Sequence, residues 1–340
     1  MKKILAFVLA LSVIFMLGCQ KNETSKKLKE EEPVISEPKE EVNEFYEQMQ
    51  SNKRPIALMI DNDVKASRPQ LGLESAYMVY EIIVEGGATR FMALFKEHDM
   101  PKVGPVRSAR HYFLDYALEH DAIYCHAGWS PQASRDISNL KVNNINGVLG
   151  VDGRCFWRDS TYDKSWHNLY TGLDKLYDMA VNTKGYRAKT DVKHTDCHKK
   201  DTDLNSENIA KRIELPYSYF YSVAYEYDEE NKVYKRYVDG EYHMSQTGEC
   251  LNAKNIIIYK VKNYNLNDGE EKGRQNIENI GSGTGVYVTN GKYVNINWSK
   301  PSRNAKTQYT LEDGSELMLN PGNTYVQIIP YNSEYKLLEK

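Results

Sequence analysis

The chain has 340 residues, of which 41% are hydrophobic and 27% are charged, a composition typical of a soluble globular protein. Its 44 basic and 47 acidic residues give a formal net charge of −3. Nucleic-acid-binding proteins carry a basic face, so this balance argues against that class. We therefore predict no nucleic-acid partner.

The first 18 residues are predicted to be a signal peptide. Lys2 and Lys3 precede an apolar run over residues 4–17 that is too short to span a bilayer comfortably. Residues 16–19, Met-Leu-Gly-Cys, resemble the lipobox of bacterial lipoproteins, so Cys19 is expected to be the lipidated (palmitate-bearing) first residue of the mature protein. The alternative is an uncleaved anchor helix. Both place the protein at the membrane, with the rest of the chain on its extracytoplasmic side.

Residues 19–53 are predicted to be a charged, flexible tether. They are rich in Lys and Glu and contain few apolar residues before Phe45, so they cannot bury enough surface to fold alone. A short helix is expected within this tether, over residues 42–50.

Residues 54–190 are predicted to form an N-terminal domain of layered sheet and helix, α/β or α+β. The apolar run at residues 55–60 indicates a buried strand that ends in the polar residues Asp61-Asn62-Asp63. α/β proteins often place their sites at the carboxyl ends of strands. Turn formation is the alternative role for these three residues.

The most informative stretch is G-P-V-R-S-A-R-H-Y-F-L-D, residues 104–115. Ser108 is expected to cap a helix whose first turn holds Arg107, Arg110 and His111. Cations are disfavoured there, because a helix N-terminus carries a partial positive charge and unsatisfied N–H groups. The placement therefore indicates a bound anion.

Two sources of this anion remain open. It can be a ligand, or a carboxylate of the fold itself, for which Glu81 and Glu85 are the candidates. A further binding element is predicted in the loop at residues 156–168, which mixes aromatic, cationic and amide groups without clear periodicity.

Residues 215–335 are predicted to form a β-rich C-terminal domain, beyond a polar connection at residues 182–215. Asn290-Gly291 between two apolar strands is a strong hairpin signal. In the connection, His194, Cys197 and His198 lie close together, but their spacing is not that of a zinc site. We expect a solvated loop there, with no metal and no cofactor.

Four cysteines remain after Cys19. Their even number permits disulfides with three possible pairings, and free thiols are the alternative; they are Cys125, Cys155, Cys197 and Cys250. Cys125 beside His126 could indicate a nucleophile, but adjacent residues of a strand point to opposite faces, which disfavours that interpretation.

Several short motifs follow one another along nearly all of the chain after the tether. They are I-D-N at residues 60–62, R-P-Q-x-G-L at 68–73, V-Y-E-x-x-V-E-G-G-x-T-R-F at 79–91, G-P-V-R-S-A-R-x-Y-F-L-D at 104–115, H-A-G-x-S-P-Q-A at 126–133, F-W-R-D at 156–159, H-N-L-Y at 167–170, G-S-G at 281–283, W-x-K at 298–300 and L-N-P-G-x-T-Y at 319–325. Together they resemble the YerB-like lipoproteins of Gram-positive bacteria. The resemblance implies a two-part extracytoplasmic lipoprotein, an α/β N-terminal domain followed by a β-rich C-terminal one. It implies no established biochemical role.

We expect a polar cleft at the strand ends of the N-terminal domain. Its predicted ligand-binding residues are Asn62, Arg90, Arg107, Arg110, His111, Trp157, Arg158, Asp159, His167 and Asn168. The candidates for a catalytic role are Asp61, Glu81, Glu85 and His126.

Two functions are weighed for this cleft. The first is binding of an anionic cell-wall polymer, a lipid-linked precursor or an envelope protein. The second is an enzyme that hydrolyses or transfers envelope glycans or phosphodiesters. There Glu81 or Glu85 would be the general base, and Arg107 and Arg110 would stabilise negative charge. No nucleophile–base pair stands out in the sequence, so binding is favoured.

Overall fold

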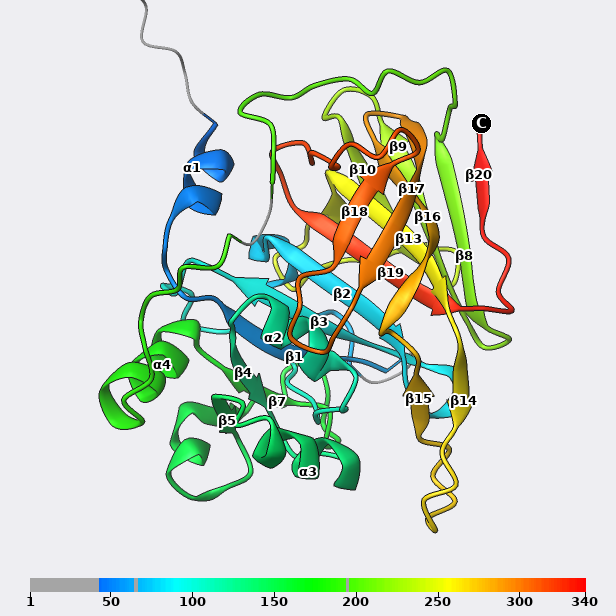
Figure 1. The fold of residues 1–340 in the computed structure, drawn as a ribbon. Coiled ribbons are helices and arrows are strands. Elements are labelled where there is room, and N and C mark those ends of the chain that lie inside the picture. The colour runs from blue at the N-terminus through cyan, green and yellow to red at the C-terminus, as the bar shows by residue number, and fades with distance from the viewer. Residues whose placement is uncertain (1–42, 64–66, 194–195) are drawn as a thin grey trace, which may run out of the picture. The chain divides into compact units, whose positions relative to one another are not determined.

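The computed structural model describes residues 43–63, 67–193 and 196–340 (Figure 1). The predicted signal peptide, Cys19 and most of the predicted tether lie outside these ranges. Val42–Lys340 form one compact unit. Within the described ranges, no helix is both long enough and apolar enough to cross a bilayer.

A ten-stranded sheet is the centre of this unit. Its strands from the first half of the chain are β1 (Ile56–Asn62), β2 (Met78–Ile83), β3 (Thr89–Phe95), β4 (Ile123–His126) and β5 (Asn144–Asn146). Those from the second half are β13 (Asn255–Val261), β16 (Gly281–Thr289), β17 (Lys292–Lys300), β18 (Gln308–Leu311) and β19 (Thr324–Pro330). The spatial order is β18-β17-β16-β13-β19-β2-β3-β1-β4-β5. The two halves join where β19 pairs with β2 in parallel.

Smaller sheets flank the large one. A six-stranded sheet contains β8 (Arg212–Ser218), β9 (Tyr221–Asp228), β10 (Val233–Val238), β11 (Glu241–Tyr242), β12 (Asn252–Ala253) and β20 (Lys336–Leu338). Two two-stranded ladders pair β6 (Phe156–Arg158) with β7 (Leu169–Thr171), and β14 (Asn263–Asn265) with β15 (Gln275–Ile277).

The helices are short and cluster in the first half of the chain. They are α1 (Glu44–Gln50), α2 (Phe113–Glu119), α3 (Pro131–Asn139) and α4 (Leu173–Asp178), with 3₁₀ turns at Leu73–Ser75, Glu85–Gly87 and Gly150–Cys155 and a π-helical turn at Met179–Thr183. Ser130 caps α3 as predicted, because its hydroxyl accepts from the N–H of Ala133. In α1, Met49 is buried, so the folded part begins before residue 53, where the tether was expected to end.

The predicted fold class is confirmed. Residues 44–183 hold helices and parallel strands, and residues 212–338 are β-rich. Every residue of β1, β2 and β3 is buried, as expected for strands covered on both faces. Because strands from both halves share one sheet, the predicted halves form a continuous core. The predicted boundary within residues 182–215 stays a prediction.

A buried ion pair links the six-stranded sheet to the large one. Glu81 on β2 accepts two hydrogen bonds from Nη2 of Arg236 on β10, at 3.0 and 2.9 Å, and both side chains are fully buried. Glu81 also accepts from the hydroxyls of Thr89 and Tyr221, each at 2.7 Å. Burial alone would lower the pKa of Arg236, but the negative charge of Glu81 holds that pKa well above its ordinary value. Glu81 therefore holds Arg236 in its charged form.

We predict that Arg236→Gln destabilises the fold by about 3–5 kcal/mol, because it leaves the Glu81 carboxylate buried without its cation. The free energy of unfolding, measured in guanidinium chloride, checks this. Lys235→Gln is the matched control. Lys235 is the neighbouring residue on β10 and pairs with Asp228, but its side chain is 42% exposed. If both variants lost the same free energy of unfolding, the assignment of Arg236 as the link between the sheets would be contradicted.

Candidate functional site

The backbone at residues 103–109 is extended and not helical. The N–H of Arg107 donates to the carbonyl of Met59 at 2.9 Å, and Val106 forms a bridge with Ile60 of β1. Because β1 accepts the hydrogen bond of the Arg107 N–H, this segment lies along the edge of β1 and does not start a helix. The helix α2 begins at Phe113 with Tyr112 as its N-cap, so the prediction that Ser108 caps it was wrong. Arg107 and Arg110 therefore precede the helix and do not lie in its first turn.

These arginines nevertheless line a polar cleft at the carboxyl end of β1. The cleft has a volume of about 410 Å³. Five cationic side chains line it, namely Arg90, Arg107, Arg110, Lys272 and Arg274. Three carboxylates line it too, those of Asp61, Asp63 and Glu85. The lining thus carries a net positive charge in a protein whose net charge is negative.

Three of the four arginines are paired to carboxylates, and for Arg107 and Arg110 these carboxylates line the cleft as well. Arg110 forms a two-pronged pair with Glu85, with Nε to Oε1 at 2.6 Å and Nη2 to Oε2 at 2.9 Å. Nε of Arg107 lies 3.1 Å from Oδ2 of Asp61, and its guanidinium carbon lies 3.7 Å from the ring centre of Trp166. The anion next to Arg110 is therefore the Glu85 carboxylate. This is the second of the two alternatives that the sequence left open, a carboxylate of the fold and not a ligand.

Arg90 differs from both. Its side chain is only 5% exposed, and Nη1 donates to the carbonyl of Ser108 at 2.6 Å. Nε has no hydrogen-bond partner, which is also true of Nε in Arg107 and Arg236, but unlike those two this guanidinium forms no ion pair with a described carboxylate. Burial, reinforced by the positive charge of Arg110, lowers the pKa of Arg90 to about 10. The charges of Asp61 and Glu85 oppose this lowering only in part. A buried cation that forms no ion pair is costly, which marks Arg90 as a candidate for binding an anion.

Asp61 links the cleft to the loop that carries His167. Nδ1 of His167 lies 2.7 Å from Oδ2 of Asp61. Burial would raise the pKa of Asp61, but the hydrogen bond from His167 and the charges of Arg107 and Arg90 outweigh it, so the pKa lies below its ordinary value. Asp61 is therefore an anion that holds Arg107 in place.

The structure brings Asp61, Glu85, Arg90, Arg107 and Arg110 together, and places the other predicted residues elsewhere. Glu81 and Asn62 belong to the buried network around Arg236, so the expectation that they line the cleft is corrected. His126 is buried and bonded to the carbonyl of Gly128 at 2.8 Å.

The remaining predicted residues also lie off the cleft lining. His111 contacts Asn276 on β15, at 2.8 Å from ring nitrogen to amide oxygen. The predicted binding loop forms the β6–β7 ladder and its connection, where Arg158 donates to Asn168 and Lys102 donates to Asp159. Trp157 pairs with Tyr170 in that ladder.

Comparison with known proteins gives a consistent assignment. The N-terminal domain of the "Protein of unknown function (DUF3048)" family matches residues 43–187, and its C-terminal domain matches residues 213–326. A Bacillus subtilis (strain 168) protein named "Putative lipoprotein YerB" is 31% identical over 331 residues, which cover 95% of this chain and 94% of that protein. The chain belongs to the YerB-like family. The crystal structure of the YerB protein from Bacillus subtilis, 30% identical, has a TM-score of 0.72 and covers 84% of this chain and 94% of that one.

In this YerB-like chain, the cleft lining includes residues that the sequence did not indicate, among them two cations and a tryptophan. Lys272 and Arg274 come from the connection between β14 and β15, and Trp129 follows β4. Arg274 is held by Asp268 at 2.7 Å, and Asp268 in turn accepts from Gln132 of α3 at 2.9 Å. No local pattern in the sequence signals this contact, because it joins segments more than 130 residues apart.

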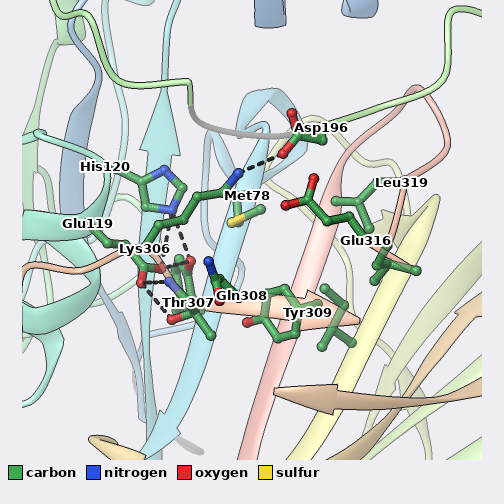
Figure 2. A pocket seen from close by; sticks show the side chains of 13 residues that line it. Met78, Glu119, His120, Asp196, Lys306, Thr307, Gln308, Tyr309, Glu316 and Leu319 are labelled. Atoms are coloured by element: carbon green, nitrogen blue, oxygen red, sulfur yellow. Dashed lines mark hydrogen bonds and ion pairs between the residues drawn. The ribbon is translucent and has the colours of Figure 1, made fainter. Parts of the chain in front are cut away.

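A second, smaller cavity of about 100 Å³ lies beside α2 (Figure 2). On its floor, Glu119 accepts from Tyr80, Lys300 and Thr307 at 2.6–2.9 Å. Burial, reinforced by the charge of Lys300, lowers the pKa of His120 to about 3, so this histidine is neutral. Lys306 pairs with Asp196 at 2.7 Å, as Figure 2 shows. Because these contacts join α2 to the second half of the chain, we interpret the network as structural.

Metal and disulfide chemistry have little support in the described part of the YerB-like fold. There, no group of three or more His, Cys, Asp or Glu side chains is arranged to hold a metal ion. Residues 194 and 195 of the predicted loop are outside the described ranges. Cys125, Cys155, Cys197 and Cys250 are free thiols. Burial raises the pKa of the Cys125 thiol well above its ordinary value, which disfavours its use as a nucleophile.

We predict that Asp61 makes the stability of the protein pH-dependent in acid. Because its folded-state pKa lies below the ordinary value of 3.8, its contribution is complete above that pH and is lost as the pH falls through the folded-state pKa. Asp61→Asn should therefore be less stable than the wild type at neutral pH, with a difference that narrows below pH 3.8. Thermal unfolding across this range checks it. Asp191→Asn serves as control, because Asp191 is exposed. A stability difference between Asp61→Asn and the wild type that stays the same at all pH values would contradict the prediction.

Proposed function

We propose that this protein is a lipid-anchored, extracytoplasmic lipoprotein that binds an anionic group of the cell envelope in the cleft around Arg90. The observation that carries the proposal is the buried guanidinium of Arg90, which has a free Nε and no carboxylate partner among the described residues. An oxyanion in the cleft would supply the missing partner. Arg107 lies beside it and adds a second guanidinium.

The chemistry of the site fits carboxylate or phosphate groups. Guanidinium groups present planar pairs of donors that match both. An anionic wall polymer, a lipid-linked precursor and an acidic segment of an envelope protein all carry such groups. The cleft volume of 410 Å³ falls within the range of about 300–1,000 Å³ that is common for small-ligand sites.

The contacts of the two glutamates favour binding over the enzyme alternative. Glu81 is fully buried against Arg236, on the sheet face away from the cleft, so it has no route to a substrate there. Both oxygens of Glu85 accept from Arg110, which holds this carboxylate in its ionised, paired state. The hydrogen bond and charge of Arg110 outweigh burial and lower the pKa of Glu85. A carboxylate with a lowered pKa is a weak general base.

The proposed anchor is the fatty acid on Cys19. The lipobox-like residues 16–19 and the similarity to a protein named as a lipoprotein support it. We predict that Cys19→Ser leaves the protein unprocessed and unlabelled when cells are fed a radiolabelled fatty acid. Equal labelling of the variant and the wild type would contradict the anchor.

We predict that phosphate raises the melting temperature of the full-length chain in detergent, and that Arg90→Met abolishes this rise. At a phosphate concentration one hundred times its Kd, the stabilisation would be about 2.7 kcal/mol. Without ligand, Arg90→Met should change the stability little, because the charges of Asp61 and Glu85 offset the cost of burying this guanidinium only in part. Differential scanning calorimetry at matched ionic strength, with chloride replacing phosphate, measures both effects.

Arg135→Gln is the matched control for this experiment. Arg135 is an arginine of α3 whose side chain is 66% exposed, and it does not line the cleft. It should keep the phosphate response of the wild type. A response that survives in Arg90→Met, or a large loss of stability in that variant without ligand, would contradict the proposal and make Arg90 a structural residue.

A further inference from the structure

We infer that the anionic group bound by the cleft is carried on a sugar, so that the ligand class is an anionic carbohydrate, phosphorylated or carboxylated. The inference rests on the proposed function, because it specifies what the anion around Arg90 is attached to. Two features lead to it, namely the carboxylates of the cleft and two tryptophans, of which Trp129 lines the cleft and Trp166 lies against Arg107.

The carboxylates are unexpected in a cleft for a bare anion, because they repel it. Asp61 and Glu85 both line the cleft beside Arg90. An ionised carboxylate offers about four acceptor positions. Glu85 uses two of them for Arg110, so acceptor positions remain for a ligand. Hydroxyl groups donate to such acceptors and phosphate or carboxylate groups do not. A ligand that has hydroxyls next to its anionic group satisfies both kinds of side chain.

The donors of the cleft show the complementary pattern. A guanidinium has five N–H donors, and Arg90 uses one of them, toward the carbonyl of Ser108. Its buried Nε–H remains for the anion. The cleft thus has donors for an anion at its centre and hydrogen-bond acceptors on its walls. An anionic sugar has the matching groups, because its anion accepts hydrogen bonds and its hydroxyls donate them.

Two tryptophans accompany these polar groups. Trp129 lines the cleft and is 37% exposed, and its backbone is fixed by a bridge to Ala109. Trp166 is 62% exposed and lies over Arg107, which also lines the cleft. Exposed indole rings beside a polar site offer flat apolar faces to a ligand. Sugar rings have C–H faces that pack on indole and hydroxyl edges that reach polar neighbours.

Isothermal titration calorimetry of the full-length chain in detergent tests the inference with four probes: inorganic phosphate, glucose 1-phosphate, glucuronate and glucose. We expect glucose 1-phosphate or glucuronate to bind at least tenfold more tightly than phosphate, and glucose to bind most weakly. Comparison of glucose 1-phosphate with glucuronate distinguishes a phosphorylated from a carboxylated sugar. Trp129→Ala should weaken binding of the preferred sugar anion at least tenfold and change phosphate affinity less than twofold.

Trp129→Phe and Trp166→Ala keep the test valid if Trp129→Ala does not fold. The phenylalanine keeps an aromatic face, so it should retain most of the preference for the sugar anion. Equal affinities for phosphate and both sugar anions would overturn the inference and leave the anion site standing. Phosphate binding that does not depend on Arg90 would overturn the proposed function as well. A tryptophan variant whose affinities for phosphate and for the sugar anion fall by the same factor would also overturn the sugar assignment.

Discussion

The buried pair of Glu81 and Arg236 is the contact on which the arrangement of this protein depends. It fixes the six-stranded sheet against the centre of the ten-stranded sheet, at a point where the chain segments are 155 residues apart. Glu81 also accepts from Thr89, the first residue of β3. The ion pair therefore holds the end of the strand from which Arg90, the next residue, enters the cleft. The Glu81–Arg236 ion pair on one face of the sheet thus helps to position Arg90, which forms no ion pair, on the other face.

Strand alternation separates these two environments. Asp61 pairs with Arg90 across β1 and β3, and the next pair is Asn62 with Thr89. Because adjacent residues of a strand point to opposite faces, Asp61 and Arg90 face the cleft while Asn62 and Thr89 face Glu81. Polar residues that are continuous in the sequence thus serve a structural network on one side and a candidate binding site on the other. The difference in their partners supports opposite roles for two buried arginines, a brace at Arg236 and an anion ligand at Arg90.

The sequence was informative where the signal is local. The apolar run of β1, the Ser130 cap of α3 and the place of Arg107 and Arg110 near the end of β1 were all predictable from neighbouring residues. The helix expected to begin at Ser108 begins instead at Phe113, because a backbone hydrogen bond to Met59 holds Arg107 beside β1. Adjacent strand residues point to opposite faces, an argument that we applied to Cys125 and His126. Applied to Asp61 and Asn62, it would have predicted that Asn62 does not line the cleft. The ion pair with Arg236, and the cations from the β14–β15 connection, depend on long-range pairing that a single sequence does not encode in any local pattern.

The central claim is that the Arg90 guanidinium binds the anion. The most direct test is nuclear magnetic resonance of the arginine side chains in a ¹⁵N-labelled protein, with the Arg90 Nε–H signal assigned by its absence from Arg90→Met. The account predicts that this signal, which comes from a buried donor without a partner, shifts on titration with phosphate or glucose 1-phosphate and saturates with the calorimetric Kd. An Arg90 signal that stays unchanged while the signal of Arg274 at the edge of the cleft shifts would contradict it.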